Sequence, residues 1–219
     1  MKNALFSLEN STIKINGHTI LSEFSLSIEK GEKIALVGQS GAGKSTLLTQ
    51  LYQLSDSEVA LVPQELGLVR NLSVFHNIYM GRLNRYQIYY NILNLIKPLK
   101  KELEKVRPIV EKLGLTDKLF TSVQELSGGQ QQRTAVGRAI FRNCPVFFGD
   151  EPVSAVDEFQ AHKVLSAITE GHETIILSMH DVELALQYSD RVIGLKNGVK
   201  VMDQSTRGMK ASDLGDLYQ

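Results

Sequence analysis

One short stretch in the first quarter of the chain restricts the possible folds more than any other. A run typical of a buried strand, Lys33–Val37, leads directly into Gly38-Gln39-Ser40-Gly41-Ala42-Gly43-Lys44-Ser45, and leucines at helical spacing begin at Leu47. The octapeptide matches the GxxxxGK[ST] phosphate loop in the strand, loop and helix context that this motif requires. Glycines let backbone N–H groups turn inward around phosphates, and the N-terminus of the helix adds its positive end. We therefore expect residues 38–46, ending at Thr46, to bind a nucleotide, with Lys44 as a point charge and Ser45 as a Mg²⁺ ligand.

Short strand-like runs alternate with longer helical patterns along the chain, and no repeat or linker interrupts them. The runs expected to form buried strands are residues 33–37, 59–62, 145–148, 174–177 and 191–195. This alternation predicts an α/β fold with a mostly parallel core sheet. The 219 residues contain 42% apolar and 22% charged side chains, which is typical of a globular domain.

Two segments depart from this alternation. Residues 5–28 form two extended runs around Asn16-Gly17, which is a strong hairpin signal and predicts a reduced antiparallel part at the N-terminus. Residues 83–120 are helical in pattern and rich in lysine and glutamate. We expect a single domain over 1–219, in which 1–82 and 134–219 form the α/β core with its antiparallel part, and 83–133 form an inserted helical subdomain.

Charge and cysteine content narrow the partners of the chain. Lysine plus arginine (24) equal aspartate plus glutamate (24), so no basic surplus favours nucleic acid as a direct partner. The single cysteine, Cys144, is expected to be a small buried residue in a reducing compartment. The N-terminal Met1-Lys2-Asn3-Ala4-Leu5-Phe6 lacks a secretory signal, and no segment approaches the roughly 20 apolar residues that cross a bilayer. We expect a cytoplasmic chain that needs a protein partner to hold it at a membrane.

A second candidate site follows the apolar run 146–148. There Gly149-Asp150-Glu151-Pro152 places two adjacent carboxylates at the C-terminal end of a buried strand, where parallel sheets bind ligands. Asp150 suits a contact with Mg²⁺, whereas Glu151 is suited to act as a general base on an attacking water. Taken alone, the pair would equally fit a loop with two solvated acids.

The segment Leu126-Ser127-Gly128-Gly129-Gln130 has a local explanation as a capping box that opens a helix. Together with the phosphate loop and the two acids, however, it resembles the signature of ABC (ATP-binding cassette) transporter nucleotide-binding subunits. The resemblance covers essentially the whole chain. Gln64 matches the Q-loop glutamine of this family, Ser154-Ala155-Val156-Asp157 resembles the D-loop, and His180 resembles the switch histidine.

The resemblance implies an ATPase that works as a head-to-tail dimer. Each ATP would lie between the phosphate loop of one subunit and residues Ser127, Gly128, Gly129 and Gln130 of the other. Gln64 would sense Mg²⁺ and the attacking water, His180 would contact the γ-phosphate, and Asp157 would couple the two sites. A helix N-terminus at Ser127 would provide free N–H groups and a positive dipole end for that anion.

A finer likeness points to importer subunits of the phosphonate type. It is carried by residues 64–83, from Gln64-Glu65-Leu66-Gly67-Leu68 onward, and by Asp213-Leu214-Gly215-Asp216-Leu217-Tyr218. This likeness implies that a small anionic solute is imported, with transmembrane permease subunits, a second copy of the ATPase and a solute-binding protein as partners.

Two features depart from the family pattern. About ten residues separate Leu54 from Gln64, where relatives carry a longer segment, so the antiparallel part is expected to be trimmed. The position at which relatives stack an aromatic ring on adenine falls at Ile15 or its neighbours in Ile13-Lys14-Ile15-Asn16. A weaker or less base-selective nucleotide site follows.

Three other functions compete with a transport ATPase. A soluble ABC ATPase acting on nucleic acid usually has a long coiled coil or two cassettes, and this chain has one cassette without sustained heptads. A module that binds ATP without turnover is disfavoured by Glu151 and His180. A phosphotransferase could use the same phosphate loop, but the segment at Ser127 distinguishes an ABC ATPase from a phosphotransferase.

Overall fold

The computed structural model describes residues 4–55 and 58–218. Residues 1–3, which belong to the expected N-terminal segment, and residues 56–57, in the shortened stretch before Gln64, lie outside the described residues. The chain divides into two compact units. The first comprises 1–59, 145–151 and 172–219, and the second comprises 60–144 and 152–171. The second unit includes all of residues 83–133. That the helical subdomain begins at 83 and ends at 133 stays a prediction.

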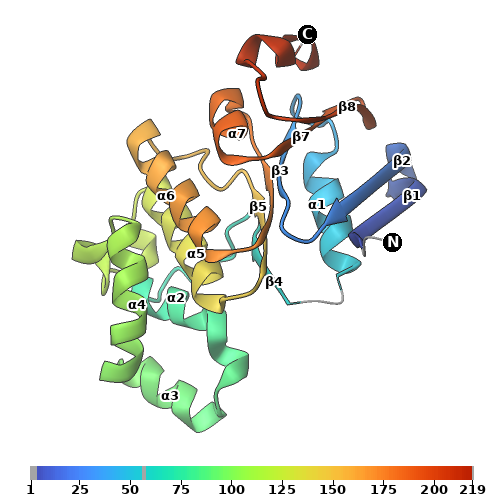
Figure 1. The fold of residues 1–219 in the computed structure, drawn as a ribbon. Coiled ribbons are helices and arrows are strands. Elements are labelled where there is room, and N and C mark those ends of the chain that lie inside the picture. Colours follow the sequence, from blue (N-terminus) through green and yellow to red (C-terminus); the bar gives the residue numbers. More distant parts are fainter. Residues whose placement is uncertain (1–3, 56–57, 219) are drawn as a thin grey trace. The chain divides into compact units, whose positions relative to one another are not determined.

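The first unit is built on a mostly parallel sheet. Its strands pair in the order β5 (Val146–Asp150), β6 (Thr174–Ser178), β3 (Lys33–Val37), β7 (Arg191–Lys196) and β8 (Val199–Ser205). The first four are mutually parallel, and β8 runs antiparallel to β7 (Figure 1). Every residue of β5 and β6 is buried, which explains why 146–148 and 175–177 are apolar runs with no alternation. The expected α/β fold is confirmed, and β3 has the expected ends.

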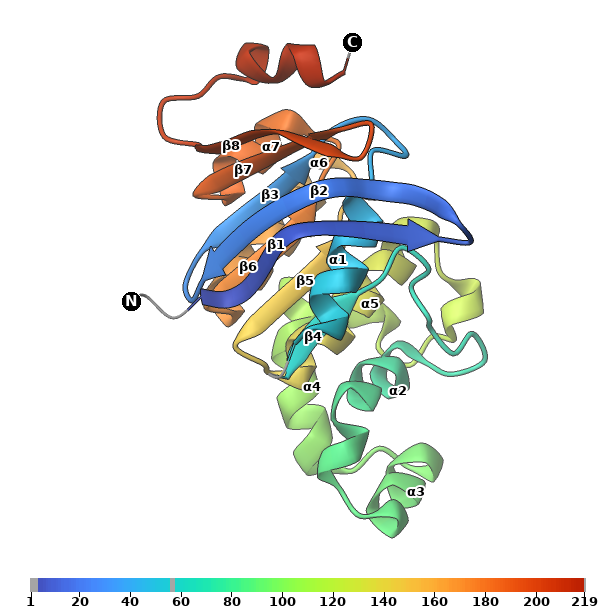
Figure 2. The same ribbon diagram turned by 90° about the vertical axis from the view of Figure 1, so that its right-hand side faces the viewer.

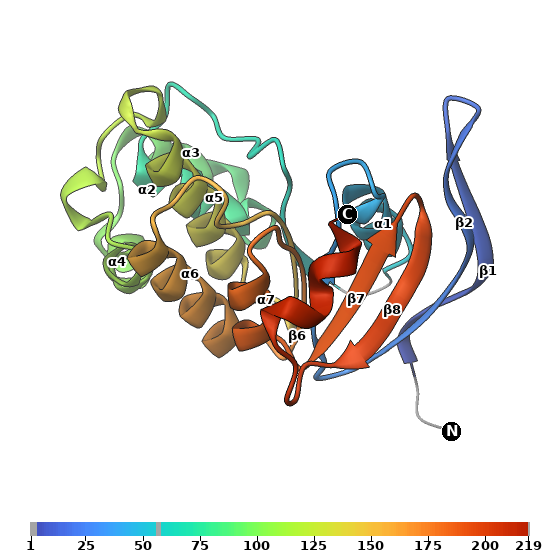
Figure 3. The same ribbon diagram turned by 90° about the horizontal axis from the view of Figure 1, so that it is seen from above.

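Two hairpins turn on the same dipeptide. β1 (Ala4–Ile15) and β2 (His18–Glu29) form a long, curved antiparallel ribbon around Asn16 and Gly17, both with positive φ (Figure 2). This confirms the expected hairpin. β7 and β8 lie side by side around Asn197 and Gly198, which also have positive φ (Figure 3). The sequence prediction did not include β8, although Asn-Gly after a strand was the signal that could have revealed it.

Helices flank the sheet within the first unit. α1 (Lys44–Gln53) begins at the last residues of the phosphate loop and buries Leu47, Leu48 and Leu51, as their spacing predicts. α7 (Val182–Tyr188) begins at Asp181, whose carboxylate accepts the Leu184 N–H at 3.0 Å. The chain ends in the 3₁₀ helix η4 (Ala211–Leu217), in which Leu214 and Leu217 are buried.

The second unit is helical. After β4 (Val59–Val62), which begins at the last residue of the first unit, come the helices α2 (Val74–Tyr79), α3 (Ile88–Ile96), α4 (Lys100–Lys112), α5 (Gly128–Arg142) and α6 (Glu158–Gly171). Three 3₁₀ turns connect them: η1 (Met80–Arg85), η2 (Thr116–Lys118) and η3 (Val123–Glu125). α5 is central, because it contacts α2, α4 and α6. α5 packs closely against α2 at Gly137, where a Cβ would lie 2.9 Å from Ile78 Cδ1.

Two smaller expectations can also be compared with the structure. Cys144 is buried, as predicted for a structural thiol. Over residues 4–55 and 58–218, none of the helices is both long enough and apolar enough to cross a membrane.

The two Asn-Gly turns give a matched test of close packing. Gly198 has φ +76°, and a Cβ there would lie 2.2 Å from the carbonyl oxygen of Ile20, whereas Gly17 has φ +83° and open space around it. We expect Gly17→Ala to lower the free energy of unfolding by about 1 kcal/mol through backbone strain alone. Gly198→Ala should cost about 2–4 kcal/mol, because the backbone of β2 must also move. Urea unfolding followed by circular dichroism measures both, and equal losses would contradict the packing argument.

Candidate active site

Two glycines of the phosphate loop lie where a Cβ would collide with neighbouring atoms. Gly38 has φ +139°, and a Cβ there would lie 2.1 Å from the carbonyl oxygen of Leu195. Gly43, the residue before α1, has φ +102°, and its Cβ would lie 2.6 Å from Leu21 Cδ2. Gly41 also has a positive φ but faces open space. The loop backbone therefore follows a path that only this glycine spacing permits.

Lys44 is the ionisable residue of the loop, and it is almost fully buried. Its side-chain Nζ donates to the carbonyl oxygens of Gly38 at 2.7 Å and Gln39 at 2.9 Å, and the residue is only 5% exposed. Burial lowers the pKa of the Lys44 ammonium, while the negative charges of Glu151 and Asp150 act in the opposite direction. Lys44 is also the first residue of α1, whose N-terminal N–H groups have no side-chain cap.

The two adjacent acids are held by a serine that the sequence prediction gave no role. The Ser178 hydroxyl, at the end of β6, donates to the carboxylate of Asp150, at the end of β5. The backbone N–H of Glu151 donates to the carbonyl oxygen of Ser178 at 3.2 Å and to its hydroxyl oxygen at 3.0 Å. Parallel pairing of Asp150 with Ser178 explains the contact, so the signal is the polar residue that ends the neighbouring strand.

Glu151 and His180 form a direct pair. Glu151 Oε1 lies 2.6 Å from His180 Nε2, and His180 follows β6 after Ser178 and Met179. Glu151 is not glycine, yet its backbone is left-handed, with φ +53°. The loop of residues 38–43, Asp150, Glu151 and His180 therefore lie at the C-terminal ends of β3, β5 and β6, where open parallel sheets bind ligands.

The signature segment opens α5 in the second unit. The Ser127 hydroxyl accepts the Gln130 N–H at 3.3 Å, and Gln130 Oε1 accepts the Ser127 N–H at 3.0 Å, which confirms the capping box. Gly129 is closely packed, because a Cβ there would lie 2.5 Å from the carbonyl oxygen of Ala155. Gly128 faces open space and could accept a larger residue or an approaching ligand.

One glutamine joins α5 to the segment expected to act as a D-loop. Gln132 donates to the Ser154 hydroxyl at 3.1 Å and accepts the Ala155 N–H at 2.8 Å. Asp157 follows, and its carboxylate accepts the Gln160 N–H at 3.0 Å at the start of α6. Gln132 was not among the expected site residues. Gln132 lies on the buried face of α5, and its place in the helical pattern could not distinguish it from a packing residue.

Gln64 is exposed and lies two residues after the end of β4, with Pro63 between them. The loop after it is attached to α5, because Arg138 donates to the carbonyl oxygens of Leu66 and Gly67, the latter at 2.7 Å. Burial lowers the pKa of the Arg138 guanidinium. Gln64, the segment from Ser127 to Gln130 and Asp157 thus belong to the second unit, and the other expected site residues belong to the first.

A pocket of about 360 Å³ opens beside the phosphate loop in the first unit. Ile13, Lys14, Ile15, Ser45, Thr46, Thr49, Gln50 and Gln53 line it. Ile15 is 47% exposed, and the lining contains no aromatic ring. On the side of α1 the pocket is lined by the hydroxyl residues Ser45, Thr46 and Thr49. It is the space beside the loop that is available to a nucleoside.

The parallel sheet, the glycine loop with Lys44 and the acid–histidine pair define a P-loop nucleotide-hydrolysing fold. A sequence profile described as "ABC transporter" matches residues 21–154, which is more than half of the chain. The chain therefore belongs to the ABC transporter family, as an ATP-binding, ATP-hydrolysing subunit of a transporter.

Curated relatives carry a more specific name. The phosphonates import ATP-binding protein PhnC of Lactobacillus johnsonii is 31% identical over 95% of this chain and 92% of its own length. PhnC 1 of Pseudomonas syringae pv. tomato is 34% identical over 93% of this chain and 87% of its own length. The resemblance to phosphonate-import subunits is confirmed at this modest identity.

Solved structures share the fold. A dimeric bacterial ABC transporter cassette has a TM-score of 0.76 at 23% identity, covering 93% of this chain and 99% of its own. A metal-chelate type ABC transporter in an inward-facing conformation has a TM-score of 0.77 at 25% identity, covering 98% and 89%.

The pocket at Ile15 leads to a prediction about base selectivity. Because an aliphatic side chain stands beside the loop, we expect ATP and GTP to bind with affinities within about threefold of each other. Ile15→Tyr should tighten ATP binding about tenfold, since an aromatic–base stack contributes roughly 1–3 kcal/mol. Isothermal titration calorimetry measures each affinity. Ile88→Tyr, at a 76% exposed site in the other unit, is the control and should change nothing. A strong preference of the unaltered chain for ATP would contradict this assignment.

Proposed function

We propose that this chain powers the import of a small anionic solute, such as a phosphonate, by hydrolysing ATP at the inner face of a cell membrane. The observation that supports this proposal most strongly is the Glu151–His180 pair, whose Oε1 and Nε2 atoms lie 2.6 Å apart. The pair belongs to the same unit as the glycine loop and Lys44. The names of the curated relatives support the phosphonate class. The chain's partners are then a second copy of itself, transmembrane permease subunits and a solute-binding protein.

Phosphate binding is assigned to residues 38–46. The N–H groups of Gly41, Ala42, Gly43, Lys44, Ser45 and Thr46 surround the phosphates, and Gln39 and Ser40 complete the loop. Lys44 donates to carbonyl oxygens at 2.7 and 2.9 Å, so its ammonium is already positioned beside this loop. An ammonium in this position offsets negative charge that develops on the transferred phosphoryl group.

The donor set fits Mg²⁺. Ser45 would supply a hydroxyl in the first turn of α1, and Asp150 would supply a buried carboxylate oriented by Ser178. The resemblance adds the amide oxygen of Gln64 to this set. These are the oxygen ligands that Mg²⁺ prefers, and this ion takes its other ligands from water and phosphate. When bound, it neutralises charge on the β- and γ-phosphates.

Hydrolysis is assigned to Glu151, with His180 and Gln64 in support. The Glu151 carboxylate orients a water and accepts its proton as the water oxygen bonds to the γ-phosphorus. The bond from that phosphorus to the β,γ-bridging oxygen breaks, which gives ADP and phosphate. His180 positions Glu151 through their hydrogen bond and contacts the γ-phosphate. The resemblance assigns Gln64 the sensing of Mg²⁺ and of the attacking water.

A second copy of the chain completes each site. The N–H groups of Gly128 and Gly129 lie at the start of a helix whose first turn carries no acidic residue, so this end of α5 favours a phosphate. Gln130 holds the cap in place, and Asp157, next to the Gln132-linked segment, would report the state of one site to the other. A structurally similar cassette is dimeric, which supports the pairing of two copies.

Replacement of Glu151 by glutamine tests the hydrolytic assignment. Glu151→Gln keeps the shape of the side chain but removes the proton acceptor, so turnover should fall by at least about 100-fold. ATP binding and ATP-dependent pairing should persist, measured by phosphate release and by size-exclusion chromatography with ATP. Glu173→Gln, a surface acid of the same unit, is the matched control and should retain wild-type turnover. Full turnover of Glu151→Gln would remove Glu151 from its role.

Copurification tests the transport assignment. The tagged chain, purified in mild detergent from its own cells, should carry a permease with several membrane spans, identified by mass spectrometry. Recovery of a phosphonate-binding protein with it would support the solute class. If only soluble nucleic-acid or ribosome factors copurify, the ATPase chemistry stands but the motor belongs to a different machine.

A further inference from the structure

The last described helix of the chain packs against the strand next to the phosphate loop. η4 (Ala211–Leu217) contacts β7 and α7, and all three belong to the first unit (Figures 1 and 3). Leu214 and Leu217 of η4 are buried. The Asp213 carboxylate accepts the Lys210 N–H at 2.9 Å and fixes the start of the helix. A short 3₁₀ helix has little stability of its own, so its contacts with β7 and α7 must hold it in place.

Two contacts attach η4 to β7. At Gly194 a Cβ would lie 2.8 Å from Leu217 Cδ1, so the leucine fills the space that a side chain on the strand would need. Two residues further along the same face of β7, Lys196 Nζ donates to the carbonyl oxygen of Asp216 at 3.1 Å. Because Asp216 and Leu217 directly precede Tyr218, these contacts also fix the place of the tyrosine ring.

The same stretch of β7 lies beside the first glycine of the phosphate loop. Parallel pairing sets Val37, the last residue of β3, opposite Gly194. Gly38 follows, and it approaches β7 so closely that a Cβ would lie 2.1 Å from the carbonyl oxygen of Leu195. Neighbouring residues of one strand therefore hold both η4 and the start of the phosphate loop.

Tyr218 brings a hydroxyl group to this place. Its oxygen is buried, and no group within residues 4–55 and 58–218 completes a regular hydrogen bond with it. Burial raises the pKa of the Tyr218 phenol, the Gly38 backbone opposes this rise, and the negative charge of Asp181 adds to it. A backbone group that lowers the pKa of a phenol is an N–H directed at the phenol oxygen, because it stabilises the charged form. The Tyr218 oxygen therefore faces the N–H of Gly38.

Gly38 connects this hydroxyl to the lysine of the loop. The Lys44 ammonium donates to the Gly38 carbonyl oxygen at 2.7 Å. One residue thus meets Lys44 on its carbonyl side and Tyr218 on its N–H side. Gly38 has φ +139° and no side chain, so its orientation depends on contacts made by its backbone.

We propose that Tyr218 is a positioning residue for the ATP site: its hydroxyl supports the backbone of Gly38, and Gly38 in turn sets where the Lys44 ammonium is held. This inference rests on the proposed binding of ATP phosphates by residues 38–46. Tyr218 takes no part in bond breaking, because Glu151 and His180 are held at the ends of β5 and β6. Its contribution is to nucleotide binding.

Removal of the hydroxyl alone tests this role. Tyr218→Phe keeps the ring, so the KM for ATP should rise about fivefold, the change expected from loss of one hydrogen bond. The kcat should stay within about twofold, because Ser178 still holds Glu151. Phosphate release over a range of ATP concentrations gives both constants. Isothermal titration calorimetry should show a similar loss of ADP affinity, because ADP occupies the same loop.

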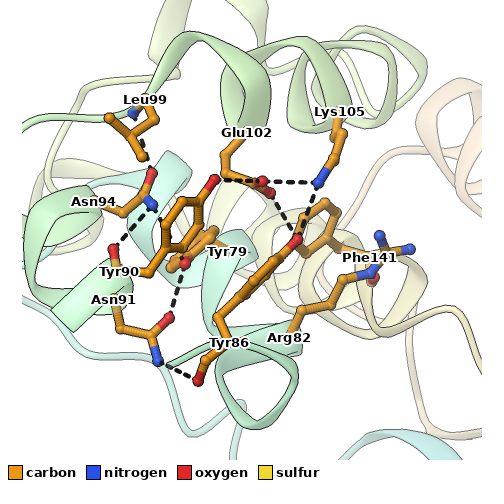
Figure 4. Close-up of polar contacts among 10 residues, drawn as sticks. All are labelled: Tyr79, Arg82, Tyr86, Tyr90, Asn91, Asn94, Leu99, Glu102, Lys105 and Phe141. Atoms are coloured by element: carbon orange, nitrogen blue, oxygen red, sulfur yellow. Dashed lines mark hydrogen bonds and ion pairs between the residues drawn. The ribbon is translucent and has the colours of Figure 1, made fainter. Parts of the chain in front are cut away.

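A tyrosine of the second unit provides the matched control. The Tyr90 hydroxyl donates at 3.0 Å to the buried carboxylate of Glu102, which also accepts Tyr86 and Lys105 (Figure 4). Tyr90→Phe also removes a hydroxyl from a partly buried ring, so it should lower the melting temperature by about 2–4 °C. Its KM and kcat should equal those of the unaltered chain, because it lies away from the loop in the other unit.

The Gly38 amide reports the contact directly. In the full chain labelled with ¹⁵N-glycine, Tyr218→Phe should shift the Gly38 amide resonance and speed its hydrogen exchange at least about fivefold. The Gly194 amide should not change, since Leu217 still packs there. This nuclear magnetic resonance measurement needs no nucleotide, so it tests the contact independently of the ATPase assignment.

Two outcomes would overturn the role of the hydroxyl. One is a Tyr218→Phe chain whose KM and Gly38 amide are both unchanged. The other is a rise in KM accompanied by a large shift at Gly194, which would trace the effect to displacement of η4. A Gly38 amide that responds in a chain unable to bind ATP would support the contact and refute the ATPase assignment, so the two failures are distinguishable.

Discussion

The parallel pairing of β5 with β6 is the interaction on which the candidate site depends. It sets Asp150 beside Ser178, so one serine hydroxyl holds the Asp150 carboxylate while its oxygen atoms receive the N–H of Glu151. His180, two residues beyond Ser178 along the chain, is thereby brought to Glu151. Two strands distant in sequence, each buried throughout, thus place Asp150, Glu151 and His180 at one sheet edge.

The second unit gathers its functional segments on a single helix. α5 carries the signature at its first turn, attaches residues 154–155 through Gln132, and attaches the loop after Gln64 through Arg138. A displacement of α5 would therefore move all three segments together, because each is hydrogen-bonded to the same rigid element. These contacts of α5 all lie within the second unit, whereas Asp150, Glu151 and His180 lie within the first.

Local patterns predicted much of this, and non-local contacts account for the rest. The glycine loop, the Asn16-Gly17 hairpin, the capping box at Ser127 and the ends of β3 all follow from residues close together in sequence. Ser178 escaped prediction because its role comes from a partner strand. The burial of Glu102 on α4 also escaped prediction, because its carboxylate accepts the hydroxyls of Tyr86 and Tyr90, which lie more than ten residues away in the sequence.

The left-handed backbone of Glu151 has a consequence for the tolerance of this position to sequence change. At φ +53° the backbone itself favours glycine or asparagine, and a long unbranched acid is an uncomfortable occupant. The conformational preference of the backbone therefore opposes the hydrolytic role that we propose for Glu151. Were the demand for a carboxylate of this reach to lapse in a descendant of the chain, neutral drift would be biased toward those smaller residues, and this position would be among the first to record the loss.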